Sequence, residues 1–168
     1  TEHYDKEGVL IEYLLYEYNE NGHQTKTECY EADGTFDFSW EYQYDAYGNR
    51  IVGIYTNKEG LKETFTYNES GTLLKRVRIS ANGDIIIYEY NENEILIKCT
   101  DIRGDWKYIA EYDEDGKIVK EFFSDNGMGG ETIKEYDEER YCVETSTTKD
   151  GMIVSKVDSS SNVIWQKI

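Results

Sequence analysis

The stretch Phe36-Asp37-Phe38-Ser39-Trp40-Glu41-Tyr42-Gln43-Tyr44, followed at once by Asp45-Ala46-Tyr47-Gly48, contains the two elements that recur along this chain. Aromatic and polar side chains alternate with a period of two, which is typical of a β-strand with one buried face. Asp and Gly then favour a hairpin turn, because Asp can bond its own backbone two residues on and Gly accepts a positive φ. The sequence therefore predicts a strand that ends in a tight turn.

The five-residue phrase Tyr-Asp/Asn-x-x-Gly is an internal repeat. Copies with Gly begin at Tyr4, Tyr18, Tyr44, Tyr67 and Tyr112, and copies without Gly begin at Tyr90 and Tyr136. From Tyr18 onward the tyrosines are 26, 23, 23, 22 and 24 residues apart, and a simpler turn such as Asp33-Gly34 lies about midway in each unit. A fixed period of this length indicates a repeat architecture. We expect one domain over residues 1–168, with repeat units that begin near residues 4, 18, 44, 67, 90, 112 and 136.

Turn signals every 10 to 14 residues predict an all-β fold. We expect an antiparallel meander of about 12–14 short strands built from hairpin repeats of about 23 residues. Because wide sheets normally twist, curl or close, we expect a curled or barrel-like sheet around the aromatic face; an elongated single-layer ribbon is the alternative. The repeat tyrosines should stack beside their neighbours and anchor the turns, and the turn glycines should adopt a positive φ. These structural residues are Tyr18, Tyr44, Tyr67, Tyr90, Tyr112 and Tyr136, with Gly22, Gly48, Gly71 and Gly116.

The composition is strongly acidic, with 35 acidic and 18 basic residues and a formal net charge of −17. This charge argues against direct binding to nucleic acid, which needs a basic surface, and against anionic membranes. Membrane insertion is not expected, because no apolar run approaches the roughly 20 residues of a spanning helix. Aromatic residues make up 14% of the chain, which favours a folded protein over a disordered acidic tail.

No catalytic or cofactor-binding motif is recognisable. The chain has two histidines, His3 and His23, and neither has a nucleophile partner in the sequence. The segment Glu17–Gly22 with Glu28 superficially fits a calcium loop, but the phrase recurs as a turn, so we interpret its acids as turn-capping groups. Cys29, Cys99 and Cys142 form no paired motif, and we expect them to be buried or half-buried strand residues. We predict no enzyme, no cofactor and no metal site; weak calcium binding is the alternative.

A repeat of about 22 residues with a Tyr-Asp-x-x-Gly turn, a strand, an Asp/Asn-Gly turn and a second strand resembles the YD repeat of the Rhs family. Tyr44–Ile51 is the closest copy, Tyr112–Val119 is nearly as good, and the resemblance covers roughly residues 4–157. In large Rhs proteins it implies a hollow β-shell around a toxic domain, and in cell-surface members adhesion and glycan binding. The chain also looks like small repeat modules of bacterial toxin–immunity systems. It departs from the family in its acidity, its lack of Pro and its length.

Charge and resemblance together predict a non-catalytic, acidic protein-interaction module. Its basic partner would be a nuclease or toxin that the module occludes as an inhibitor or immunity protein. The candidate contacts are acidic turn residues, namely Asp113, Glu114, Asp115, Glu138 and Glu139. An inhibitor would be cytoplasmic, whereas a processed form would be secreted or at the cell surface.

Two alternatives remain open at this point. One is a carbohydrate-binding surface or secreted repeat protein, because an exposed aromatic stripe would suit sugar stacking. The residues of that stripe are Phe36, Phe38, Trp40 and Tyr42, for which we expect a core role first. The other is a fragment of a larger toxin-encapsulating shell.

Overall fold

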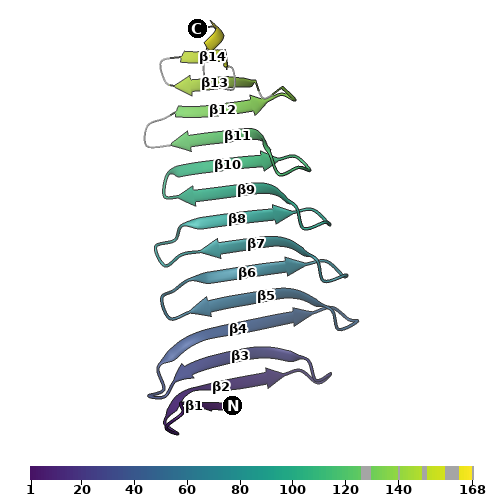
Figure 1. The fold of residues 1–168 in the computed structure, drawn as a ribbon, viewed down its shortest axis with the longest axis vertical. Coiled ribbons are helices and arrows are strands. Elements are labelled where there is room, and N and C mark those ends of the chain that lie inside the picture. The colour runs from purple at the N-terminus through teal and green to yellow at the C-terminus, as the bar shows by residue number, and fades with distance from the viewer. Residues whose placement is uncertain (126–129, 140, 149–150, 158–162, 168) are drawn as a thin grey trace. The chain divides into compact units, whose positions relative to one another are not determined.

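The computed structural model describes residues 1–125, 130–139, 141–148, 151–157 and 163–167. These residues form fifteen β-strands and no helix, so the predicted all-β antiparallel meander is confirmed. In the part of the chain described, therefore, no helix has the length and apolar character needed to cross a bilayer. The chain divides into two compact units, Thr1–Asn82 (unit 1) and Gly83–Ile168 (unit 2), which are described separately below (Figure 1).

Unit 1 contains seven strands, and each pairs antiparallel with the next one in the sequence. They are β1 (Glu2–Tyr4), β2 (Leu10–Tyr18), β3 (Gln24–Glu31), β4 (Phe36–Tyr44), β5 (Arg50–Asn57), β6 (Lys62–Tyr67) and β7 (Leu73–Ile79). The predicted strand of alternating aromatic residues is β4, with the same bounds.

Unit 2 contains eight strands in the same sequential antiparallel order. They are β8 (Ile85–Tyr90), β9 (Leu96–Arg103), β10 (Trp106–Tyr112), β11 (Ile118–Asp125), β12 (Gly130–Tyr136), β13 (Cys142–Thr148), β14 (Gly151–Val157) and β15 (Val163–Lys167).

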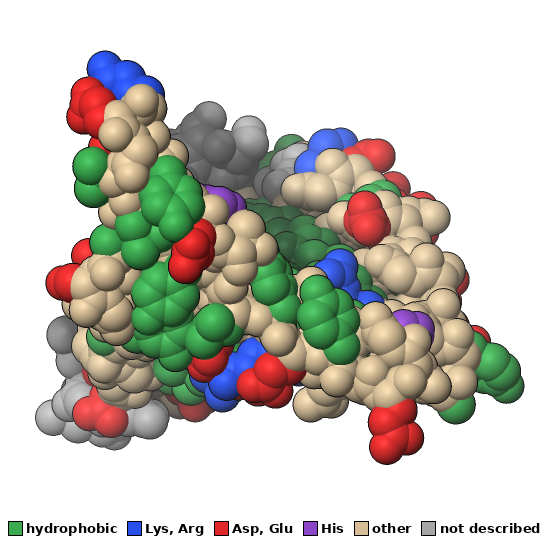
Figure 2. All heavy atoms as spheres, turned by 90° about the horizontal axis from the view of Figure 1, so that it is seen from below, with side chains coloured by type: hydrophobic (Ala, Val, Ile, Leu, Met, Phe, Trp, Pro, Cys, Tyr) green, Lys and Arg blue, Asp and Glu red, His purple; other side chains and the backbone are tan. Residues whose placement is uncertain are grey.

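Each unit is a single layer of strands, and within its described residues the sheet is not closed into a barrel. Among the described residues of each unit, a strand contacts only its neighbours in the sequence, so the first and last strands do not meet. Side chains pack across neighbouring strands on the same face of the sheet. Among the residues that the structure describes, the buried apolar ones are Cys29, Ala110 and Cys142. Large apolar groups such as Val9 and Leu15, 60% and 51% exposed, remain at the surface, and Figure 2 shows such groups beside acidic ones.

The aromatic stripe of β4 is half-buried rather than part of a closed core. Trp40 lies between Tyr55 and Phe65 with ring centroids 5.2 and 5.6 Å away, and it stacks on Tyr42 at 5.9 Å. Phe36 is not part of this aromatic group. The pairing of β3 with β4 shifts by one residue beside Phe36, and its ring contacts Tyr30.

A one-residue bulge follows almost every Tyr-Asp turn. Tyr18 pairs with Gln24, six residues on, whereas the preceding Glu17 pairs with Lys26, nine residues on, so Thr25 has no partner opposite it. The same shift occurs at Tyr4, Tyr44, Tyr67, Tyr90 and Tyr112. Bulges of this kind increase the local twist of a hairpin.

The structure also shows where the repeat is out of phase. The turn after Tyr4 joins β1 to β2, and the turn after Tyr18 joins β2 to β3, so these two copies lie at opposite ends of the strands. This explains why only 14 residues separate them. In unit 2, the pairing of Val157 with Val163 shows the same one-residue shift in register, at a position without a repeat tyrosine.

Glu94 provides a test of the turn. It is the one non-glycine residue with a positive φ (60°) among the described residues, at the position that Gly occupies in the other copies. Because a side chain is strained in this region, Glu94→Gly should stabilise the protein by about 0.5–1 kcal/mol in urea unfolding. The matched variant Asn93→Gly, at a negative φ, should instead be neutral or destabilising. A loss of stability in Glu94→Gly would contradict this account.

Candidate functional site

The Tyr-Asp turns are built by one oxygen atom of the Asp or Asn that follows the tyrosine. In the copy at Tyr112, Oδ1 of Asp113 accepts backbone N–H groups from Asp115 and Lys117 at 3.0 and 2.8 Å. The N–H of Gly116 donates to the carbonyl of Asp113 at 3.0 Å, and Gly116 has a φ of 76°. The side chain therefore holds both ends of the loop and leaves Glu114 and Asp115 at the tip.

The same bonds recur in the other copies. The capping residues that accept two backbone N–H groups are Asp5, Asn19, Asp45, Asn68, Asn91 and Asp113. Asn57, which the sequence pattern did not identify, takes the same role in a turn at the opposite end of the strands: its Oδ1 accepts the N–H of Leu61 at 2.9 Å. The predicted structural glycines Gly22, Gly48, Gly71 and Gly116 all have a positive φ.

The repeat tyrosines differ in what they contact. The hydroxyl of Tyr44 donates to the carbonyl of Gln24 at 2.7 Å, which ties one Tyr-Asp turn to the preceding hairpin. In unit 2, the hydroxyls of Tyr108 and Tyr136 both donate to the carboxylate of Glu121. Burial and these hydrogen bonds raise the pKa of both phenols. Tyr18 is 60% exposed, whereas Tyr44, Tyr67, Tyr90 and Tyr112 are half-buried.

The acidic residues at the tips gather at one end of unit 2. Its Tyr-Asp turns join β8 to β9, β10 to β11 and β12 to β13, so all three lie at the same end of the strands. We name their acids the acidic edge: Glu92, Glu94, Asp113, Glu114, Asp115, Asp137, Glu138 and Glu139. The predicted contact residues all belong to it, and all except the half-buried Asp113 are exposed.

A groove lies between two turns of the acidic edge. Its volume is about 400 Å³, and it is lined by Asp113, Asp115, Lys117, Val119, Tyr136, Asp137 and Glu138. The structure thus brings together three of the predicted residues, Asp113, Asp115 and Glu138. Glu114 and Glu139 are exposed on the same turns but do not line this groove.

Charges on the strands of unit 2 alternate in sign, whereas its turn tips carry mostly acidic residues. Across β8–β12, one row of directly opposed residues alternates in sign: Glu89, Lys98, Glu111, Lys120 and Glu135. Ion pairs of 3.4 Å (Lys98 to Glu111) and 2.7 Å (Lys120 to Glu135) form in it. The sequence contains a signal for this row. Glu directly precedes the repeat tyrosines Tyr90 and Tyr112, and a Lys lies eight residues after each tyrosine.

Two cations reach the groove residues. Lys117 contacts Asp115 at 3.3 Å and Lys156 contacts Asp137 at 3.6 Å. Asp115 nevertheless remains 76% exposed and Asp137 48% exposed, so their carboxylates stay accessible to solvent. Solvent-exposed pairs of this kind are weak and are screened by salt. The acidic edge therefore retains a negative surface that could attract a positive partner.

The ring of His3 bonds Glu12 at 2.7 Å on an exposed strand, and the ring of His23 packs beside Tyr44. No group of three His, Cys, Asp or Glu side chains among the described residues has the geometry to hold a metal ion. Cys29 and Cys142 are buried, Cys99 is half-buried, and all three are free thiols, as expected of strand residues. Burial raises the pKa of each thiol, which keeps it protonated at neutral pH.

No protein-family model and no curated protein matches this chain. Among solved structures, a chain in the crystal structure described as TcdB2-TccC3-Cdc42 aligns with 94% of this chain at 11% sequence identity and a TM-score of 0.33. The aligned region is 13% of that chain, so this chain spans a small part of that protein's length. No conclusion about family or function follows from a similarity this weak, and the YD/Rhs resemblance stays a prediction.

Substitutions at Asp113 test whether the turn depends on the acceptor oxygen of this side chain or on its negative charge. Asn takes its place in other copies, so Asp113→Asn should keep both backbone bonds and leave the unfolding free energy nearly unchanged. Asp113→Ala removes the acceptor from a half-buried turn and should cost about 1–2 kcal/mol in urea unfolding. Equal stability of the two variants would show that Oδ1 does not build the turn.

Proposed function

We propose that this protein is a non-catalytic protein-interaction module whose acidic edge binds a basic protein partner. The observation that supports this proposal is the contrast in unit 2 between a row of strand charges that alternate in sign and turn tips that carry mostly acidic, exposed side chains. The tips of unit 1 do not show the same density of acids, since its turns after Tyr18, Tyr44 and Tyr67 contain Glu20, Asp45 and Glu69.

The geometry of the edge fits a partner with spaced basic side chains. Consecutive Tyr-Asp turns are separated by two strands, which places successive acidic tips about 10 Å apart. A Lys or Arg side chain of the partner would enter the groove between Asp115 and Glu138, and neighbouring tips would contact flanking cations. Such complementarity raises the association rate and favours basic partners over acidic ones.

An inhibitor or immunity role is the finer form of this proposal. A nuclease or a toxin that acts on nucleic acid binds phosphates through Lys and Arg side chains. A row of carboxylates that covers those side chains would exclude the nucleic acid from its groove. The surface that the acidic edge would occupy is therefore the substrate groove of a basic nuclease or toxin.

The first experiment identifies the partner and its salt dependence. The full chain is used for affinity purification from native cell lysate at low salt and at about 0.5 M salt, where the Debye length falls below about 5 Å. We expect a basic protein that is retained at low salt and released at high salt, identified by mass spectrometry. Retention that does not depend on salt would contradict an electrostatic interface.

Matched charge variants then locate the interface. Glu114→Gln, Glu138→Gln and Glu139→Gln are combined in one protein, and Glu7→Gln, Glu20→Gln and Glu59→Gln, also exposed, in a control with the same net charge. The first variant should bind the captured partner at least tenfold more weakly, and the control should lose much less. Equal losses would show that only net charge matters and would overturn the assignment to the acidic edge.

A carbohydrate-binding function has a separate site in its favour. A groove of about 280 Å³ in unit 2 is lined by Trp106, Phe123, Ser124, Asp125, Gly130 and Thr132. The ring of Trp106 stacks on Tyr108 at 6.2 Å, and Tyr108 contacts Phe123 at 4.8 Å. An aromatic surface beside hydroxyl and carboxylate groups suits a sugar ring. Glycan-array binding that Trp106→Ala abolishes, while the acidic-edge variant retains it, would favour this function over the first.

A further inference from the structure

Two successive Tyr-Asp turns of unit 1 enclose the ring of His23. His23 is the fifth residue after Tyr18, and its backbone N–H donates to Asn19 Oδ1 at 2.9 Å. Its imidazole lies edge-on against the ring of Tyr44, with centroids 4.8 Å apart at 64°. A Cβ added to Gly48 would meet Cε1 of the imidazole at 2.4 Å. The ring therefore fills the space between the tyrosine and the glycine of the next turn.

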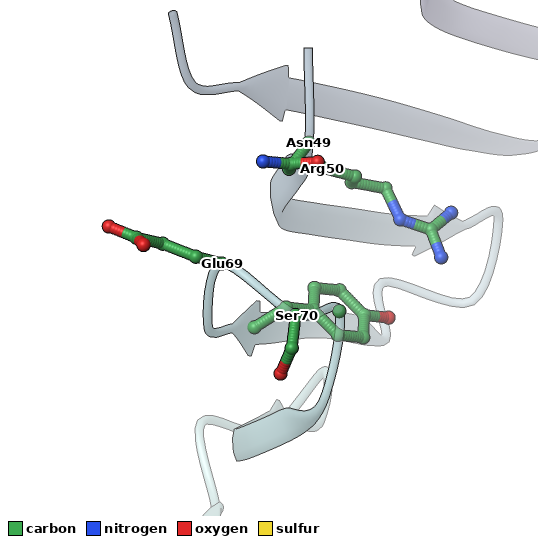
Figure 3. Close-up of a pocket in the computed structure, with 6 residues that line it drawn as sticks. Asn49, Arg50, Glu69 and Ser70 are labelled. Carbon is green, nitrogen blue, oxygen red and sulfur yellow. The ribbon is translucent and has the colours of Figure 1, made fainter. Parts of the chain in front are cut away.

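The equivalent space one repeat further on is open. It is a groove of about 160 Å³ lined by Asn49, Arg50, Tyr67, Glu69, Ser70 and Gly71 (Figure 3). Asn49 takes the place of His23, Tyr67 that of Tyr44 and Gly71 that of Gly48 in the repeat. A Cβ added to Gly71 would meet nothing within 4 Å, in contrast to Gly48. A cavity of about 150 Å³ is large enough for a benzene-sized ring.

The side chain of Asn49 explains why this groove stays open. Its amide Nδ2 donates to Asp45 Oδ2 at 2.9 Å, within its own turn, so it does not extend over the next turn as His23 does. The guanidinium of Arg50 lies over the rings of Tyr42 and Tyr67, 5.4 and 5.0 Å from their centroids. In Figure 3 the Arg50 guanidinium and the Glu69 carboxylate point in opposite directions, away from the space between them.

We propose that this groove is a binding site for a five-membered nitrogen heterocycle, namely the imidazole of a histidine side chain on a partner. The same chain provides the template, because an imidazole already occupies the equivalent place against Tyr44 and Gly48. The rim of the open groove is polar, since Glu69 and Ser70 line it and the hydroxyl of Ser70 donates to Asn68 Oδ1 at 2.7 Å. This site is independent of the acidic edge, so either proposal can fail alone.

The test is an NMR titration of the full chain with imidazole and, separately, with N-acetylhistidine methylamide. Saturable amide shifts are expected at Asn49 and at Glu69–Gly71 with both ligands. Guanidinium at the same concentration should not reproduce them, because it lacks the ring. Absence of saturable shifts with either heterocycle, or equal saturable shifts with guanidinium, would overturn the proposal.

Two substitutions test the site from opposite directions: one fills the open groove with a side chain, and the other empties the space that His23 occupies. Asn49→His should place an imidazole in the open groove, abolish the shifts at Glu69–Gly71 and raise the melting temperature. His23→Ala should open the first space, so that imidazole produces new saturable shifts at Gly48 and restores part of the lost melting temperature. The titration of the unaltered protein does not depend on either variant. Undiminished shifts in a folded Asn49→His protein would place the ligand elsewhere and overturn the assignment.

Discussion

The Oδ1 atom of the residue after each repeat tyrosine is the constraint on which the architecture depends. By accepting two backbone N–H groups, it fixes a five-residue loop with a left-handed glycine and sets the register of the strands that leave it. The bulge that follows shifts the pairing by one residue at Tyr18, Tyr44 and Tyr67 alike. Since register decides which side chains share a face, these turns also place the aromatic rows and the alternating Glu–Lys row.

Different residues of a turn have different roles, which explains how the same backbone geometry can present different side-chain chemistry. The capping residue and the glycine build the loop, whereas the tip residues and the fifth residue after the tyrosine are free to vary. At that fifth position His23 fills the space beside the next turn, Asn49 bonds back to its own turn, and Lys117 pairs with an acid. One backbone geometry thus gives a filled space, an open polar groove and an acidic groove.

Local features could be predicted from the sequence, and features that depend on distant parts of the chain could not. The strand over Phe36–Tyr44 and the turns at Asp45 and Asp113 follow from alternation and from side-chain to backbone bonds within five residues. Whether the sheet closes could not be predicted, because closure depends on whether the first and last strands meet. The acids of the edge could be named from the sequence, but which of them line a groove depends on how neighbouring turns face each other. The register shift at Val157 could not be predicted from the tyrosine repeat, because it occurs there without a tyrosine.

A sheet whose strands contact only their sequence neighbours has no interior that must be filled all at once. Within each unit, the stability of a hairpin then depends on its own turn and on the two interfaces beside it, as in a one-dimensional array. Local unfolding should begin at a terminal hairpin and proceed inward. The protection of backbone amides from hydrogen exchange would then depend on how far a hairpin lies from the end of the sheet, rather than on how deeply the amides are buried. The same additivity lets evolution lengthen or shorten such a unit by one hairpin repeat without redesigning the remainder.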